Sequence, residues 1–186
     1  MSSPLHKHVV SFIHRVWGSK DYFPGPQPVS IERRHFPILR GGEYVVCEKT
    51  DGERHMLIAT TFEGKPHCLL VNRAFDMIEI KINLNKKAYE GTILDGELYD
   101  TTLMVYDALL IHGTPVGHLN LYQRLAEAEK MLKCIIYMKF DVYRLKLKTF
   151  YAFKDFEHFM DVYLPTVQQN VDGIVLTPIH EPVRIG

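Results

Sequence analysis

The sequence predicts an α+β domain in which antiparallel β-sheets are flanked by helices. Short apolar runs bounded by polar turns outnumber the segments with helical apolar spacing, and they follow one another along the chain as a meander. The chain has 186 residues, of which 46% are hydrophobic, so it is long enough to bury the core of one domain. Because no repeat, low-complexity segment or linker divides it, we expect a single domain over residues 1–186.

Three helices are predicted. The first lies within residues 1–20 and ends near Gly18. The second begins at Asn120, which is placed as an N-cap with Gln123 three positions later for a capping box. The third covers residues 155–163. The apolar positions that define the first two helices are Val9, Phe12, Ile13, Val16, Leu121, Leu125, Ala128 and Leu132.

Strands are predicted for much of the remaining chain. Residues 21–42 hold several prolines and are predicted to be an extended lead-in to a strand-rich core over residues 43–186. The Glu63-Gly64-Lys65 stretch predicts a hairpin turn between the second and third strands. The predicted strands are 44–47, 56–59, 68–71, 77–82, 92–94, 103–106, 108–111, 143–150 and 173–177.

The composition limits the possible partners. Twenty-two basic and 22 acidic residues give a formal net charge of zero, so any contact with RNA must come from local patches. The three cysteines form no CxxC pair, which argues against a zinc ribbon or a disulfide framework and favours a reducing compartment. The N-terminus lacks the apolar run of a signal peptide, and no apolar stretch is long enough to span a bilayer. We expect a soluble, intracellular protein of the cytoplasm or nucleus with no membrane partner.

Lys49 is the candidate nucleophile. It follows an apolar strand and comes directly before Asp51 and Gly52, which predict a tight turn at the edge of a sheet. Lysine attacks phosphorus only when neutral, so desolvation or nearby cations must lower its pKa. Arg54, just beyond the turn, could bind a phosphate. Taken alone, this short pattern favours a surface strand end with a solvated lysine.

Two further Asp-Gly pairs favour a functional site over a solvated surface lysine. Asp95 and Glu97 are two residues apart and are predicted to share one strand face, where two carboxylates suit Mg²⁺ together with substrate phosphates. Asp172 supplies a third carboxylate associated with a strand. Each Asp-Gly pair could instead be a hairpin turn. Their order along the chain, with a lysine in the first and a glutamate in the second, favours a common site.

The same stretches carry a resemblance to a known family. In order, Lys49-Thr-Asp-Gly-Glu-Arg54, Leu94-Asp-Gly-Glu-Leu98, Tyr106-Asp-Ala-Leu-Leu-Ile-His-Gly113 and Asp172-Gly-Ile-Val-Leu176 resemble four motifs of the covalent nucleotidyltransferases. That superfamily comprises polynucleotide ligases and RNA-capping guanylyltransferases. Residues 23–30 resemble capping enzymes of cellular or large-DNA-virus type. Residues 49–54, 177–178 and 181–186 are likewise similar to capping enzymes rather than to ligases. The resemblance covers nearly the whole chain and implies the nucleotidyltransferase fold.

The resemblance implies a role for each motif residue. Lys49 would carry the nucleotide as a phosphoramidate, Tyr106 would stack on the base, and Lys148 would contact the guanine carbonyl, which favours guanine over adenine. The residues implied to bind the nucleotide are Glu48, Thr50, Asp51, Arg54, Arg73, Glu97, Tyr106, Lys146, Lys148 and Asp172. The residues implied to hold Mg²⁺ or Mn²⁺ are Glu97, Asp172 and Asp95.

Alternative interpretations of these residues remain. Tyr106, with its apolar neighbours, could simply belong to the core. Lys146 and Lys148 are predicted to share one strand face, which could be an ordinary solvated basic face.

The function implied is mRNA guanylyltransferase, which moves GMP from GTP through a covalent lysine intermediate to a 5′-diphosphate RNA end. A polynucleotide ligase charged with AMP and a non-catalytic module that binds nucleotide or a capping partner are the alternatives. Capping implies an RNA triphosphatase and a cap methyltransferase as partners, and a virus factory as the location if the protein is viral. The family continues into a lysine-rich fifth motif and an OB-fold domain. We expect neither within residues 1–186, so the chain would be either a shortened piece or a minimal enzyme.

Overall fold

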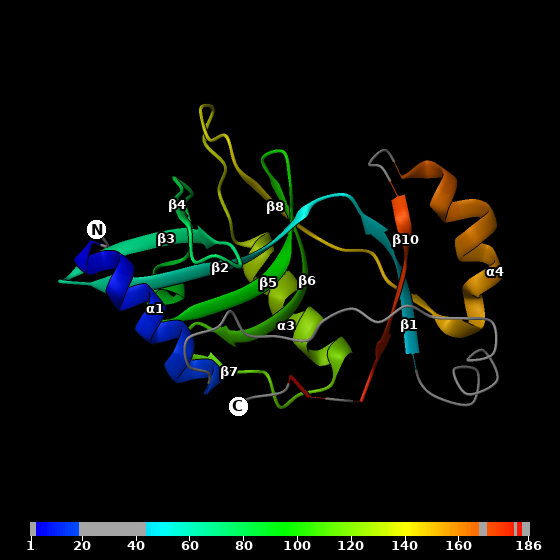
Figure 1. Cartoon of the computed structure of the whole chain (residues 1–186), viewed down its shortest axis with the longest axis horizontal. Coiled ribbons are helices and arrows are strands. Elements are labelled where there is room, and N and C mark those ends of the chain that lie inside the picture. The colour runs from blue at the N-terminus through cyan, green and yellow to red at the C-terminus, as the bar shows by residue number, and fades with distance from the viewer. Residues whose placement is uncertain (1–2, 19–43, 168–170, 181, 184–186) are drawn as a thin grey trace.

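The computed structural model describes residues 3–18, 44–167, 171–180 and 182–183, with the side chain of Asp172 outside this set. It has two β-sheets with helices against them (Figure 1). The predicted lead-in over residues 21–42 lies outside the described residues. The larger sheet has the order β4 (Met77–Glu79), β3 (Lys65–Val71), β2 (Glu53–Phe62), β5 (Thr92–Tyr99), β6 (Thr102–Ile111) and β7 (Thr114–Pro115), with β8 (Arg144–Leu147) also beside β6. The smaller has the order β10 (Val171–Pro178), β1 (Tyr44–Thr50) and β9 (Tyr151–Ala152).

Antiparallel pairing dominates both sheets, which confirms the predicted class. The β2–β3 hairpin turns at Glu63 and Gly64, whose φ angles of 51° and 76° are both left-handed, and Phe62 pairs with Lys65 across the turn. A turn with two positive φ angles matches the right-handed twist of the strands that it joins. The pairing of β6 with β8 is parallel, and a simple meander does not predict it.

Helix α1 (Pro4–Trp17) covers one face of the larger sheet. Ser3 caps its first turn by accepting a hydrogen bond from the His6 backbone N–H, and Gly18 ends it with a φ of 69°. Its apolar face packs on one hydrophobic cluster, so the predicted N-terminal helix is confirmed. That cluster includes Val9, Phe12, Ile13, Trp17, Met56, Ile58, Leu69, Val71, Ile93 and Leu109.

Helix α3 (Leu121–Lys133) packs on the other face of the sheet. The predicted capping box is present, with the Asn120 and Gln123 side chains each accepting a hydrogen bond from the other's backbone N–H. Arg124, buried on this helix, donates from Nε to Asp107 of β6 over 2.7 Å, which fixes the helix to the sheet. Ala128 and Met131 of the helix join the larger hydrophobic cluster. Among the described residues, no helix combines the length and the apolar character needed to cross a membrane.

Two crossings join the sheets and correct the predicted strands. The chain passes from β1 to β2 through Asp51 and Gly52, and it returns from β8 to β9 through residues 148–150. The predicted strand 143–150 is therefore wrong beyond Leu147, because the chain leaves one sheet there, and the Lys148 backbone N–H donates to Val105. The predicted strand 77–82 ends early, at Glu79.

Short helical segments cover the outer side of the small sheet. They are α4 (Phe156–His158), a π-helical turn (Phe159–Tyr163) and two 3₁₀ turns (Phe153–Asp155 and Leu164–Thr166), where one regular helix was predicted over 155–163. Phe159 is fully buried, and the Tyr151 ring of β9 lies 5.7 Å from the Phe159 ring and 4.9 Å from the Tyr163 ring. A further 3₁₀ turn, Lys86–Glu90, precedes β5.

Candidate functional site

Lys49 lies near the end of β1, in the small sheet, where the chain is about to cross to the large one. Its side chain is exposed, whereas the neighbouring Glu48 and Thr50 are buried. Across the strand pair, Lys49 faces Gly173 of β10, and the register shifts between Lys49 and Thr50. Because Gly173 has no side chain, and a Cβ built there would meet none of the described residues within 4 Å, these residues leave space open beside the lysine.

The turn after Lys49 rests against β5. The Gly52 backbone N–H donates to Oε1 of Glu97 over 2.5 Å. A Cβ at Gly52 would lie 2.7 Å from both Cγ of Glu97 and the carbonyl oxygen of Leu98, so glycine is the residue that permits this approach. Glu97 therefore holds the turn that follows the candidate nucleophile.

Glu48, Lys148 and Glu97 form a group that we call the lysine cluster, in which Glu48 and Lys148 are buried and Glu97 is partly buried. The Nζ atom of Lys148 lies 3.7 Å from Oε1 of Glu48 and 3.8 Å from Oε2 of Glu97. Lys148 and Glu48 are each 4% exposed, and Oε2 of Glu48 has no hydrogen-bond partner among the described residues. With two carboxylates to one ammonium, the cluster has a formal charge of −1 and unused acceptor capacity, which together favour an additional cation or hydrogen-bond donor.

Arg54, Asp95 and Tyr106 form a second group, the arginine cluster. Arg54 donates to both carboxylate oxygens of Asp95, over 3.1 Å from Nε and 2.7 Å from Nη2, and the Tyr106 hydroxyl donates to Oδ1 over 3.0 Å. Burial, followed by the adjacent Asp95 carboxylate, raises the pKa of Tyr106 well above its usual value. Both oxygens of Asp95 thus accept hydrogen bonds from the protein, and the expected metal role of Asp95 stays a prediction.

The prediction that Lys146 and Lys148 share one strand face is wrong. Lys146 is exposed on β8, opposite Met104, whereas Lys148 lies beyond the strand end and is buried in the lysine cluster. Their spacing of two would place them on one face only if the strand continued. The alternative of a solvated basic face therefore does not describe Lys148.

The Asp-Gly pairs are not three hairpin turns. Only Asp51 with Gly52 lies at a bend between strands, while Asp95 with Gly96 and the pair at 172–173 lie within β5 and β10. Gly96 is needed there, because a Cβ would come within 2.6 Å of the Met104 carbonyl oxygen of β6. The expected metal role of Asp172 is not tested, since its side chain is outside the described set.

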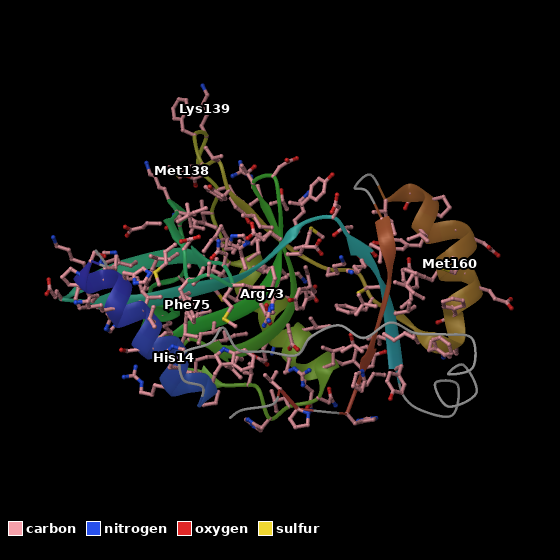
Figure 2. The ribbon with its side chains drawn as sticks, viewed as in Figure 1. His14, Arg73, Phe75, Met138, Lys139 and Met160 are labelled. Atoms are coloured by element: carbon pink, nitrogen blue, oxygen red, sulfur yellow. The ribbon has the colours of Figure 1, made fainter. Side chains whose placement is uncertain are left out.

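Arg73 belongs to neither cluster. It is exposed, on the turn that follows β3, and is labelled in Figure 2. Asn72 organises that turn by accepting hydrogen bonds from the Ala74 and Asp76 backbone N–H groups. Among the described residues, no three His, Cys, Asp or Glu side chains are arranged to hold a metal ion.

Tyr163 borders the site and carried no signal in the sequence. It lies in the π-helical turn over the small sheet, and burial raises its pKa, opposed by a hydrogen bond with Thr149 and supported by the nearby Glu48 carboxylate. Thr149 directly follows Lys148, so this contact ties the covering turn to the lysine cluster. The pairing of Lys148 with Glu48 was also not foreseen, because one hundred positions separate the two residues in the chain.

Comparisons with known proteins agree with one another. A family model described as mRNA capping enzyme, catalytic domain, matches residues 5–186. The chain is 38% identical over 91 residues to the mRNA-capping enzyme subunit alpha of Schizosaccharomyces pombe, covering 43% of this chain and 23% of that protein. It is 28% identical to the Neurospora crassa protein of the same name, over 88% of this chain and 48% of that one. The mRNA-capping enzyme of Danio rerio is 26% identical over 84% of this chain and 30% of its own length. The chain thus spans less than half the length of these relatives.

Proposed function

The chain belongs to the mRNA capping enzyme family, matching its catalytic domain, and on that premise we propose that it is a guanylyltransferase with Lys49 as its nucleophile. The observation that carries this proposal is the position of Lys49. It is an exposed lysine beside space left open by the described residues, at the point where the two sheets meet, next to the lysine cluster with its unused acceptor capacity.

In the first step the neutral amine of Lys49 attacks the α-phosphorus of GTP. An N–P bond forms, the bond between the α-phosphorus and the bridging oxygen breaks, and pyrophosphate leaves with the electron pair. Lys49 must first give up its ammonium proton. The Lys49 side chain is exposed, so water can take that proton, whereas the neighbouring Glu48 lies on the opposite, buried face of β1.

In the second step a terminal oxygen of a 5′-diphosphate RNA attacks the phosphorus of the lysine adduct. The N–P bond breaks, and Lys49 regains a proton. The relatives matched by this chain are named capping enzymes, and several are named as a subunit, which supports the proposal that an RNA triphosphatase and a cap methyltransferase act with this chain.

Lys148 supports the proposed choice of guanine. Its distances of 3.7 and 3.8 Å to two carboxylates are longer than good hydrogen bonds, so its ammonium retains donor capacity for a base carbonyl. A cation at this place favours the O6 carbonyl of guanine over the amino group of adenine.

The residues present fit a divalent cation only in part. Glu97 offers a carboxylate beside the turn that follows Lys49, and Asp172 lies in the strand that pairs with Lys49, whereas Asp95 already accepts hydrogen bonds from Arg54. Mg²⁺ needs few protein oxygens when substrate phosphates supply others. Bound there, it would neutralise charge on the departing pyrophosphate.

The test is covalent labelling with α-labelled GTP or ATP and Mg²⁺ or Mn²⁺, followed by denaturing electrophoresis. We expect an acid-labile, alkali-stable GMP adduct with the unaltered chain and none with Lys49→Arg, because a guanidinium stays protonated and cannot attack. Lys65→Arg, at the exposed β2–β3 turn, is the matched control and should label normally. Labelling that survives in Lys49→Arg would remove Lys49 as the nucleophile. Labelling with ATP alone would make the chain a ligase-like enzyme.

A further inference from the structure

The turn of residues 72–76, which we call the Arg73 turn, begins at the edge of the large sheet where the arginine cluster lies. The last residue of β3, Val71, pairs with Met56 of β2. Because the strands are antiparallel, two positions further along β3 correspond to Arg54, two positions earlier along β2. The turn that carries the exposed Arg73 therefore starts level with a residue of the proposed nucleotide site.

Hydrogen bonds within the Arg73 turn fix the shape of its backbone. The Asn72 side chain accepts from the Ala74 N–H over 3.0 Å and from the Asp76 N–H over 2.9 Å. The Asn72 backbone N–H donates to the Asp76 carbonyl oxygen over 3.1 Å, and the Asn72 carbonyl oxygen accepts from the Phe75 N–H over 3.0 Å. These bonds set the form of the turn, but they do not set where the turn lies against the rest of the domain.

Phe75 has an unusual backbone conformation within this turn. Its φ angle is 61°, in the left-handed region that bulky side chains rarely adopt. Glycine and asparagine adopt this conformation at lower cost. A residue held in such a conformation persists only where surrounding contacts maintain it, and such residues gather at functional sites. The phenylalanine ring is therefore expected to supply a contact that a less strained residue would not.

Helix α1 contacts Phe75 at two places. Nε2 of His6 donates to the Phe75 carbonyl oxygen over 2.8 Å, and the centre of the His14 ring lies 5.4 Å from that of the Phe75 ring. Phe75 is partly buried and packs on the hydrophobic cluster that α1 shares with the large sheet. Figure 2 shows Phe75 beside His14, with Arg73 further towards the small sheet. Phe75 thus fastens the Arg73 turn to a helix that is itself packed on the sheet.

We propose that Phe75 is a positioning residue for Arg73, and that α1 acts through it to hold the Arg73 guanidinium where it meets the phosphates of GTP. The inference rests on the proposed function, because it takes the nucleotide as the ligand of Arg73. A guanidinium matches a phosphate through two parallel hydrogen bonds, which form only when its backbone is correctly placed. Fixing that backbone before the ligand arrives also reduces the conformational entropy lost on binding.

The test is a double-mutant cycle on the Kd for GTP that carries a fluorescent group on its ribose, measured by anisotropy with Mg²⁺. Every variant also carries Lys49→Arg, so that binding is measured without adduct formation. Arg73→Ala should weaken binding by about tenfold or more, as expected for the loss of a charged hydrogen bond. Phe75→Asn removes the ring but suits the left-handed φ, and it should weaken binding by roughly fivefold. With Arg73 already alanine, Phe75→Asn should change the Kd by less than about twofold.

Two controls separate positioning from general packing of α1. Phe62→Asn removes another ring that contacts this helix, since the Phe62 ring centre lies 4.8 Å from that of His8, but Phe62 is at the far end of β2 from the Arg73 turn. It should leave the Kd unchanged. Phe75→Tyr keeps a ring against His14 and should bind as the parent does. Urea unfolding followed by circular dichroism checks that every variant is folded under the assay conditions.

The positioning role is refuted if Phe75→Asn weakens binding equally with arginine and with alanine at position 73. It is also refuted if Phe62→Asn weakens binding as much as Phe75→Asn does, because the effect would then belong to α1 packing in general. Labelling of the unaltered chain with α-labelled GTP separates this inference from the proposed function. A GMP adduct together with additive losses removes the role of Phe75 alone, whereas a chain that neither binds the analogue nor forms the adduct removes both proposals.

Discussion

The two charged clusters at the sheet junction differ in how far their hydrogen bonds are satisfied. In the arginine cluster, Asp95 accepts three hydrogen bonds of 2.7–3.1 Å. In the lysine cluster, the ammonium lies 3.7 and 3.8 Å from its carboxylates, and one carboxylate oxygen of Glu48 has no partner among the described residues. Both clusters combine buried or partly buried ions from segments far apart in the sequence.

The difference indicates different roles. A buried ion pair in which both carboxylate oxygens accept short hydrogen bonds holds strands in place, and replacing one partner leaves the other charge without compensation. A buried group with unused acceptors costs stability, and native proteins retain such groups mainly where a ligand or reaction needs them. We therefore expect changes in the lysine cluster to reduce catalysis, whether or not they also reduce stability, and changes in the arginine cluster to act through stability.

The largest effect should come from Glu97. Glu97→Ala removes the acceptor that holds the Gly52 turn and one of the carboxylates proposed to hold the metal ion. We expect formation of the GMP adduct to fall by roughly a hundredfold or more, the scale seen when one preorganised group is lost from an active site.

Glu97→Gln separates two contributions to that loss. It keeps an acceptor for the Gly52 N–H but removes the negative charge. Single-turnover labelling of both variants measures the loss, and urea unfolding checks that the fold persists. Full activity in Glu97→Gln would show that its charge is not used.

Asp95→Ala should have the next largest effect, on stability. It leaves the Arg54 guanidinium, with a side chain 17% exposed, without its carboxylate. We expect the free energy of unfolding to fall by about 3 kcal/mol, as for other broken buried pairs. Urea denaturation followed by circular dichroism measures the loss. Glu127→Ala breaks the exposed pair with Lys130 and is the control, with an expected loss below about 0.5 kcal/mol. Equal losses in the two variants would contradict a structural role for Asp95.

Tyr106→Phe should have a smaller effect that depends on pH. At pH 8 the variant loses one hydrogen bond to a charged acceptor, worth roughly 1.5–3 kcal/mol. The folded protein holds the pKa of Tyr106 well above 10, whereas the unfolded chain releases that proton near pH 10. The contribution of Tyr106 is therefore fully present below pH 10 and is lost as pH rises further.

The stability gap between Tyr106→Phe and the unaltered chain should accordingly narrow between pH 9 and about 11. Unfolding in urea across this range measures it. Other buried groups contribute to the alkaline slope of both proteins, among them Cys47, whose pKa burial raises to about 12. Those contributions cancel in the difference. A gap that does not change with pH would show that the Tyr106 hydroxyl is not held in its neutral form by the cluster.

Lys146→Ala should have the smallest effect. Its side chain is exposed on β8, outside both clusters, so we expect changes below about 0.5 kcal/mol in stability and about twofold in adduct formation. Lys148→Ala, two positions later, leaves the buried Glu48 and the partly buried Glu97 without their shared cation and should reduce both quantities strongly. A large effect of Lys146→Ala on labelling would return this lysine to the nucleotide site.

The sequence by itself determined the elements that depend on local rules. The N-terminal helix, the capping box at Asn120 and the hairpin turn at Glu63 all follow from spacing or side-chain chemistry within a few residues, and the structure confirms them. Family membership also follows from the sequence, since the motifs around Lys49, Glu97, Tyr106 and Asp172 occur in a fixed order.

Only the tertiary structure decided how the motif residues are paired. Whether Asp95 pairs with Arg54, and whether Lys148 is solvated or buried with Glu48, depends on contacts between segments that are tens of residues apart. The pattern of alternation gives the face of a strand but not the place where the strand ends, so it could not separate Lys146 from Lys148. That separation arises because the chain leaves the large sheet after Leu147 and crosses to the small one, which brings Lys148 between two carboxylates.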